Sequence, residues 1–170
     1  MNMSGFLAGL AHPVSGADHI LAMVAIGLWG VVAGGRALWV WPVAFVSMVL
    51  VGFAAAVTGF HASLVEPAIV TSLVALGLLV ALAVRAPLWL GAVIAGLFAF
   101  FHGHAHGTEA SAAGVQLIAY ATGFSLATAA LHALGVGAGL LTARLVGEPL
   151  LRAMGGLVAV SGLAMIAGVT

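Results

Sequence analysis

Residues 87–109 have the sequence PLWLGAVIAGLFAFFHGHAHGTE, an uncharged apolar run that leads directly into three histidines and a glutamate. The first part, up to about His102, has the composition of a membrane-spanning helix. The second part adds His104, His106 and Glu109 within the next seven residues. The stretch therefore predicts an apolar helix that carries a cluster of metal-binding side chains.

The composition extends the membrane prediction to the whole chain. Hydrophobic residues make up 64% of the 170 residues, charged residues only 5%, and the mean hydropathy is +1.30. Soluble domains have charges on about a quarter of their residues, so this chain has too little polar surface to be surrounded by water. The length allows about six spans of roughly 20 residues. We therefore predict an all-α fold with one polytopic transmembrane domain, residues 1–170.

Six transmembrane helices are expected, and the first of them is expected to be broken at Pro13. The apolar runs and their breaks place the helices at about residues 5–33, 38–60, 67–84, 87–102, 112–134 and 149–169. The glycine-rich segment 135–139 either continues the fifth helix or interrupts it. Most of the 24 glycines are expected to be packing surfaces, because small residues let helices approach closely in lipid.

The arginines predict the orientation in the membrane. Arg36, Arg85, Arg144 and Arg152 fall in the gaps after the first, third and fifth spans. The positive-inside rule then places these gaps in the cytoplasm and both termini on the outer side. The tryptophans at positions 29, 39, 41 and 89 lie near the predicted cytoplasmic boundary and are expected to be interface anchors.

The charged and sulfur-containing residues exclude several classes of protein. The net charge is zero and nothing resembles a nucleic-acid-binding surface. Cysteine is absent, which excludes disulfides, thiolate zinc sites and thiol nucleophiles. The first residues, MNMS, lack the basic region that begins a signal peptide. The expected partners are a divalent metal ion and the lipid bilayer.

A second cluster of potential ligands, HPVSGADH, occupies residues 12–19. Ser15 and Asp18 have the spacing of a helix start, so the main part of the first helix is expected to begin near Gly16. Asp18 is then either a capping residue or a metal ligand. The neighbouring His12 and His19 favour the ligand, because a helix cap needs neither histidine and ionisable groups in membrane helices are usually functional.

The histidines of the fourth span allow two arrangements. On a continuous helix, His102, His106 and Glu109 face one way and His104 the other. If the glycines at positions 103 and 107 unwind the helix, all three histidines converge. Imidazole and carboxylate together suit Ni²⁺, Co²⁺, Cu²⁺ or Zn²⁺. His104 is therefore either a further ligand or a solvated loop residue.

Two histidines lie outside these clusters, and a structural role is expected for both. His61 ends the second span with Glu66 close by, where either could be an accessory ligand. His132 lies deep in the fifth span and shares a helix face with Ser125 and Thr128. The alternative for His132 is an inner station on an ion pathway.

The two clusters resemble the signatures of the HupE/UreJ family of bacterial nickel permeases. Those signatures are His-x5-Asp-His in the first span and Phe-His-Gly-x-Ala-His-Gly-x-Glu in the fourth, and the chain matches both at every defined position. The resemblance covers essentially the whole chain. It implies uptake of nickel across the cytoplasmic (inner) membrane for hydrogenase or urease maturation. It carries the ligand role over to His12, Asp18, His19, His102, His106 and Glu109, whereas His104 falls on a variable position.

The function expected from these observations is secondary transport of Ni²⁺, with Co²⁺ and Zn²⁺ as the alternatives. The ion is then a bound substrate, no catalytic cofactor is expected, and the protein is not an enzyme. No nucleotide-binding motif is present, so direct use of ATP is not expected. One alternative is an intramembrane zinc-dependent hydrolase, with three His/Asp ligands and an activated water. Another is a metal-binding sensor or accessory subunit.

Overall fold

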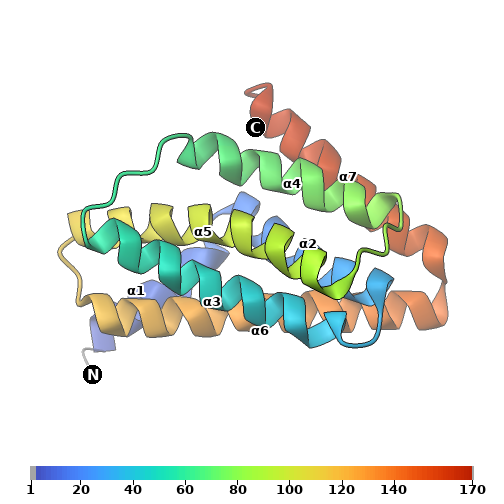
Figure 1. The fold of residues 1–170 in the computed structure, drawn as a ribbon, viewed down its shortest axis with the longest axis horizontal. Helices are drawn as coiled ribbons and strands as arrows, with labels where there is room; N and C mark the ends of the chain where they lie inside the picture. The colour runs from blue at the N-terminus through green and yellow to red at the C-terminus, as the bar shows by residue number, and fades with distance from the viewer. Residues whose placement is uncertain (1–2, 170) are drawn as a thin grey trace.

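The computed structural model describes residues 3–169, and these residues form helices joined by short turns (Figure 1). The prediction of an all-α fold is confirmed for this part of the chain, which contains no strand. The helices are α1 (Met3–Ala11), the 3₁₀ turn η1 (His12–Val14), α2 (Ala17–Ala33), α3 (Ala37–Val57), α4 (Val65–Ala81), α5 (Leu88–Ala112), α6 (Leu117–Leu145) and α7 (Glu148–Ile166).

The helices pack in pairs around α2. The closest pairs are α3 with α5, α4 with α7, and α6 with both α1 and α2. Helix α2 also contacts α3, α4 and α7, so it lies at the centre of the bundle. Its side chains Met23 and Ile26 are fully buried, together with Phe45 of α3 and Phe124 of α6. These residues belong to a continuous apolar core.

The predicted number of six membrane spans is only partly supported. Four helices, α3, α5, α6 and α7, are long and apolar enough to cross a membrane, and the bent pair α1–α2 makes a fifth candidate. Helix α4 is apolar but has only 17 residues. At 1.5 Å per residue it is about 25 Å long, which is shorter than the roughly 30 Å of a bilayer core. The sixth span stays a prediction.

The first helix is broken where the sequence predicts it. Helices α1 and α2 meet at an angle of 76°, and Pro13 lies in the short 3₁₀ turn between them. The predicted start of the second part near Gly16 is confirmed, because α2 begins at Ala17, whereas the alternative of Asp18 as a capping residue is wrong. The Ser15 hydroxyl donates to the His12 carbonyl oxygen, 2.6 Å away. Gly16 is instead the N-cap residue of α2, in extended backbone and without a side-chain cap.

Helix α5 continues without interruption through the histidine cluster, so the alternative in which it unwinds at its glycines is wrong. Those glycines are contact points for α3. A Cβ atom at Gly103 would collide with the Val49 carbonyl oxygen, and one at Gly52 would collide with the Phe100 carbonyl oxygen. Helix α6 is likewise continuous through residues 135–139. The close approach of α3 and α5 fixes which face of α5 points into the bundle.

The interface role predicted for the tryptophans is wrong for Trp29 and Trp41. Both are fully buried, and their ring centroids lie 4.1 Å apart. Trp29 donates a hydrogen bond to the Val84 carbonyl and Trp41 to the Leu88 carbonyl, each at 2.9 Å. The pair therefore fixes the linker between α4 and α5 from inside the bundle. Trp39 and Trp89 are exposed, in agreement with an interface position.

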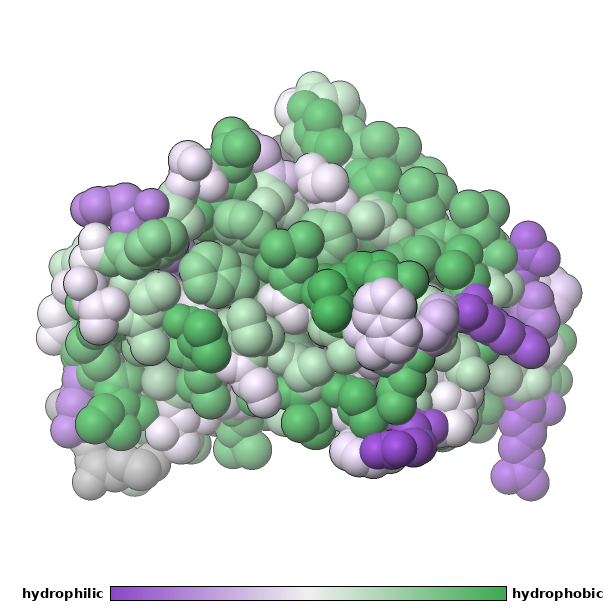
Figure 2. All heavy atoms as spheres, viewed as in Figure 1, coloured by the Kyte–Doolittle hydropathy of each residue, from purple (hydrophilic) through white to green (hydrophobic). Residues whose placement is uncertain are grey.

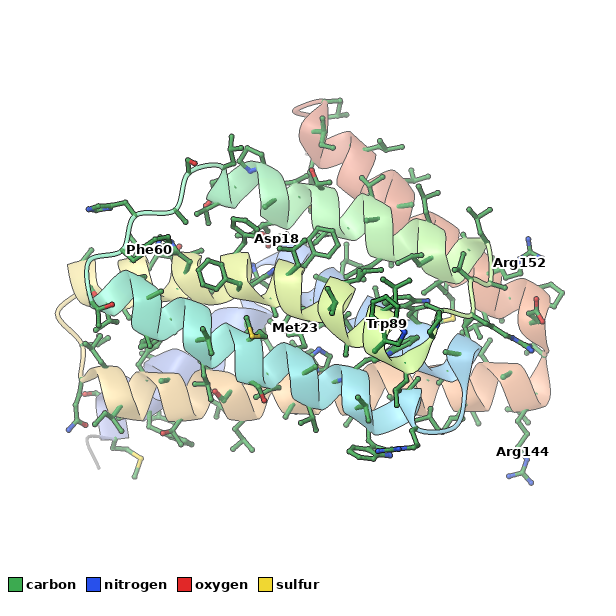
Figure 3. All side chains as sticks on the ribbon, viewed as in Figure 1. Asp18, Met23, Phe60, Trp89, Arg144 and Arg152 are labelled. Atoms are coloured by element: carbon green, nitrogen blue, oxygen red, sulfur yellow. The ribbon has the colours of Figure 1, made fainter. Side chains whose placement is uncertain are left out.

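The surface separates apolar flanks from polar ends. Figure 2 shows hydrophobic residues across the middle of the visible face and hydrophilic ones mostly toward its ends. The side chains of Arg144 and Arg152 lie at one end of the molecule (Figure 3), and the N-terminus lies at the other (Figure 1). Large apolar side chains are exposed on the flanks of several helices, as expected where helices face lipid.

We predict that Gly103→Ala destabilises the protein by about 1–3 kcal/mol, because the added methyl group forces α3 and α5 apart. Gly137→Ala is the matched control, since a Cβ atom there meets nothing within 4 Å. Thermal unfolding in detergent measures both variants. Equal unfolding midpoints for Gly103→Ala and Gly137→Ala would show that this helix contact is not restrictive.

Candidate metal site

Three segments that are distant in sequence bring the predicted ligands together. The turn η1 carries His12, the first turn of α2 carries Asp18 and His19, and the C-terminal half of α5 carries the second cluster. The bend after η1 directs His12 toward α5, so that its ring centroid lies 4.7 Å from that of His106. The two sequence clusters thus form one site.

The outer part of the site combines two imidazoles with a carboxylate. Glu109 Oε2 lies 2.9 Å from His12 Nε2 and 3.5 Å from His106 Nδ1. One potential ligand atom from each of the three residues lies within 4.8 Å of the other two. Glu109 and His12 are partly exposed, whereas His106 is buried. This group could hold a divalent ion at the edge of the bundle.

The carboxylate of Asp18 is bound to the neighbouring histidine. Its Oδ1 lies 2.9 Å from His19 Nδ1. A carboxylate accepts hydrogen bonds, so His19 Nδ1 carries the proton and its Nε2 keeps a free lone pair. In this arrangement Asp18 orients a potential ligand, which is a common role for a carboxylate beside a metal site.

His102 is oriented in the same way by the backbone. Its Nδ1 lies 2.9 Å from the Phe98 carbonyl oxygen one turn earlier in α5. A carbonyl can only accept, so Nδ1 is the donor and Nε2 again keeps its lone pair. His102 is fully buried, and its ring centroid lies 5.2 Å from that of His19.

The inner part of the site is rich in nitrogen atoms without hydrogen-bond partners. Within the described part of the chain, Nε2 of His19, His102 and His106 is buried and unbonded. A buried polar atom left unsatisfied costs about 1–3 kcal/mol, so each of these three atoms is unfavourable without a partner. The ring centroids of His19 and His106 are 4.5 Å apart. Coordination of a metal ion would remove that cost for each nitrogen that becomes a ligand.

His104 does not join this cluster. It points to the opposite side of α5, where its Nε2 lies 2.7 Å from the Phe60 carbonyl oxygen and 3.2 Å from the Ala62 amide nitrogen. The loop backbone therefore occupies this ring nitrogen in either tautomer. The continuous helix explains the direction, because residues 102 and 104 differ by about 200° around the helix axis. His104 holds the loop between α3 and α4.

The other predicted residues lie around the site. His61 and Glu66 are exposed and line a cavity of 290 Å³ on which Glu109 also borders. His132 is not brought into the cluster; it is buried deeper in the bundle. The structure thus joins His12, Asp18, His19, His102, His106 and Glu109, and it leaves His61, His104 and His132 outside.

Two aromatic residues of α6 beside the site were not anticipated from the sequence. The Phe124 ring centroid lies 4.2 Å from that of His106, and the Tyr120 centroid lies 5.9 Å from that of His12. The Tyr120 hydroxyl is buried without a hydrogen-bond partner among the described residues. Tyr120 is the single tyrosine of the chain, and a lone phenol in a predicted span is the signal that could have identified it.

Comparison with known proteins identifies the family of this chain. Residues 1–165 match the family described as HupE / UreJ protein. The chain belongs to the HupE/UreJ family. It is 42% identical over 168 residues to "Protein HupE" of Rhizobium leguminosarum bv. viciae, an alignment that covers 99% of this chain and 87% of that protein. No solved structure matches the chain.

Family membership and the apolar helices together make this HupE/UreJ protein a multi-pass membrane protein. Its site lies between helices that have the composition of membrane spans. Ionisable side chains in such helices are rare and normally face the interior of the bundle or a water-filled cavity. His102 and His106 follow this rule, because they lie against η1, α2 and α6 rather than lipid.

We predict that Asp18→Asn weakens Ni²⁺ binding to the purified protein by about 10- to 100-fold, because His19 loses the charged partner that orients it. Calorimetric titration in detergent measures the affinity. The control is Glu148→Gln, which removes an exposed acid at the arginine-containing end of the bundle. An unchanged affinity in Asp18→Asn would exclude the orienting role.

We predict that His104→Ala mainly loosens the loop between α3 and α4. Loss of its contact with the loop backbone is worth about 1 kcal/mol, which corresponds to a roughly fivefold larger population of the locally open state. Hydrogen exchange of residues 58–64 measures this opening. Ni²⁺ affinity is expected to fall much less than in His102→Ala. A loss of affinity equal to that of His102→Ala would instead make His104 a ligand.

Proposed function

We propose that this protein is a secondary transporter that takes up Ni²⁺ across the cytoplasmic membrane without hydrolysing ATP. The observation that carries the proposal is a cluster of neighbouring imidazole rings inside an apolar bundle. The buried, unbonded Nε2 atoms of His19, His102 and His106 lie beside the group His12, His106 and Glu109, whose ligand atoms are within 4.8 Å of one another. Nickel itself rests on the resemblance to bacterial nickel permeases, because imidazole and carboxylate ligands also suit Co²⁺ and Zn²⁺.

The exposure of the ligands gives the site a direction. Glu109 and His12 are 55% and 33% exposed at the side chain, whereas His102 and His106 are fully buried. In our proposal the partly exposed pair receives the hydrated ion. His106, His19 and His102 then replace its water molecules in turn as it moves into the bundle. The carboxylate compensates the positive charge where the ion first leaves water.

The type of ligand suits an ion that must be released again. The chain has no cysteine, so soft thiolates, which hold Ni²⁺ and Zn²⁺ tightly, are absent. Nitrogen and oxygen ligands bind these ions reversibly. A transport site needs binding that is strong enough to capture the ion and weak enough to release it.

The proposed direction of transport is inward. The positive-inside rule assigns the end that carries Arg144 and Arg152 to the cytoplasm, and this end is opposite to the N-terminus (Figures 1 and 3). Glu109 lies near the C-terminus of α5, at the opposite end of that helix from its arginine-side start at Leu88. Both termini are accordingly proposed to lie on the outer side.

The alternative of an intramembrane zinc hydrolase has less support. Such an enzyme needs a metal-bound water that faces a substrate cavity. The outer cavity of 290 Å³ borders on Glu109 but on none of the three histidines with free Nε2 atoms. Neither the family match nor the similar protein favours a hydrolase. A sensor or accessory subunit would bind Ni²⁺ but would not transport it.

We predict that proteoliposomes containing the wild-type protein accumulate ⁶³Ni²⁺, and that both Asp18→Asn and His102→Ala reduce the initial rate by about tenfold or more, since each damages a different half of one site. Glu148→Gln is the control and is expected to transport at the wild-type rate. Intact folding of each variant is checked by gel filtration in detergent.

The outcomes separate the three functions. Uptake that is lost in both site variants supports a transporter with one site shared by α2 and α5. Stoichiometric Ni²⁺ binding without uptake by the wild type contradicts transport and leaves the sensor. Zinc-dependent hydrolysis of lipid amides or esters by the purified protein would instead establish the enzyme.

A further inference from the structure

A second polar position lies deeper in the bundle, on α6. His132 is 1% exposed, and neither of its ring nitrogens has a hydrogen-bond partner among residues 3–169. A structural histidine in an apolar core normally has its N–H group paired, because an unsatisfied buried donor is unfavourable. His132 is therefore not explained by packing alone.

Two hydroxyl groups lie on the same side of α6 as His132. Ser125 and Thr128 precede it by seven and four residues, so the three side chains share one face of the helix. Both hydroxyl oxygens are buried and unpaired in the part of the chain that the structure describes. In contrast, Thr122 on another face of α6 donates to the Ile118 carbonyl at 2.7 Å. Ser125 and Thr128, on the same face as His132, thus lack the hydrogen bond that a helical hydroxyl often donates to a carbonyl of the preceding turn.

One aromatic ring separates His132 from the site described above. The ring centroid of Phe45 lies 4.9 Å from that of His132 and 5.7 Å from that of His102. Phe45 is fully buried and offers no metal ligand. Pro42, less than one turn earlier in α3, removes one backbone hydrogen bond from the helix. The two imidazoles are therefore adjacent positions with an apolar partition between them.

His132 also borders the outside of the bundle on the arginine side. A groove of 560 Å³ between α3 and α6 is lined by His132 together with Leu38, Trp39 and Val136. Leu38 and Trp39 belong to the first turn of α3, directly after Arg36. The remaining lining is almost entirely apolar. His132 is the one ionisable side chain among the residues that line this groove.

We propose that His132, together with the Thr128 hydroxyl, is a second cation-binding station, on the cytoplasmic side of Phe45. The inference rests on the proposed transport function and extends it, because it assigns an inner site to the same ion. One imidazole and one hydroxyl, completed by water, offer fewer protein ligands than the candidate metal site described above, so they bind a divalent ion more weakly. A weaker inner site favours release toward the cytoplasm.

The test uses the absence of cysteine from the chain. The His132→Cys variant contains a single thiol, which a small thiol-specific reagent can reach through the groove. The probe is Ni²⁺ alone, added to the purified protein in detergent. We expect saturating Ni²⁺ to slow modification of this thiol by about tenfold, since a coordinated sulfur cannot react. The control is Ala130→Cys, on an exposed face of the same helix, where Ni²⁺ is expected to have no effect.

Two further variants distinguish a ligand from a structural histidine. Thr128→Val in the His132→Cys background is expected to weaken the protection by Ni²⁺. His132→Gln is expected to keep the Ni²⁺ affinity of the outer site within about twofold and to lower uptake by about tenfold. The uptake and affinity of His132→Gln also test the role of His132 as a ligand if the His132→Cys variant does not fold.

Equal modification rates with and without Ni²⁺, or wild-type uptake by His132→Gln, would overturn the inner station. Failure of the transport function itself is distinguishable. In that case the wild-type protein shows no uptake at all, while thiol protection still reports whether a cation reaches position 132.

Discussion

The break in the first helix at residues 12–16 is the constraint on which the rest of the site depends. In a continuous helix, His12 and His19 would lie about 10 Å apart along the axis, with His12 beyond the reach of α5. The 76° bend instead lays α1 against α6. It brings His12 Nε2 within 2.9 Å of Glu109 and the His12 ring within 6.5 Å of the His19 ring. Two sequence clusters become one site through this bend.

Hydrogen bonds at Nδ1 determine which ring nitrogen of His19 and His102 is free to bind a metal ion. Asp18 and the Phe98 carbonyl accept the Nδ1 protons of His19 and His102, so the Nε2 atom of each ring keeps its lone pair. Gly103 packs directly against α3, and this contact fixes which face of α5 carries His102 and His106 into the bundle. The ligands are thus oriented before any ion arrives. The unsatisfied nitrogens raise the free energy of the empty site, which strengthens ion binding.

Much of the fold and of the site could be predicted from the sequence, but only those features that depend on the geometry of a single helix. The break at Pro13, and the opposite directions of His104 and the pair His102 and His106, follow from local geometry. The burial of Trp29 could not be predicted, because a uniformly apolar helix has no polar face to show which side meets lipid. The unwinding of α5 was a wrong alternative for a related reason. The glycines of α5 are contact points for α3, and the local sequence of α5 does not show which helix will pack against it.

The packing also indicates which helices can move as an ion passes. Helices α3 and α5 touch backbone to backbone at Gly52 and Gly103, a contact that allows little change. The boundary between α3 and α6 is different, because two apolar grooves of 560 and 650 Å³ lie along it. Phe45 lies on α3, and His132, which its ring contacts, lies on α6. A charged ion cannot cross an apolar ring without great cost. On the proposed pathway, the Phe45 ring must therefore move aside for an ion to pass from His102 to His132. The boundary between α3 and α6, which is packed less closely than that between α3 and α5, is where this movement meets the least resistance.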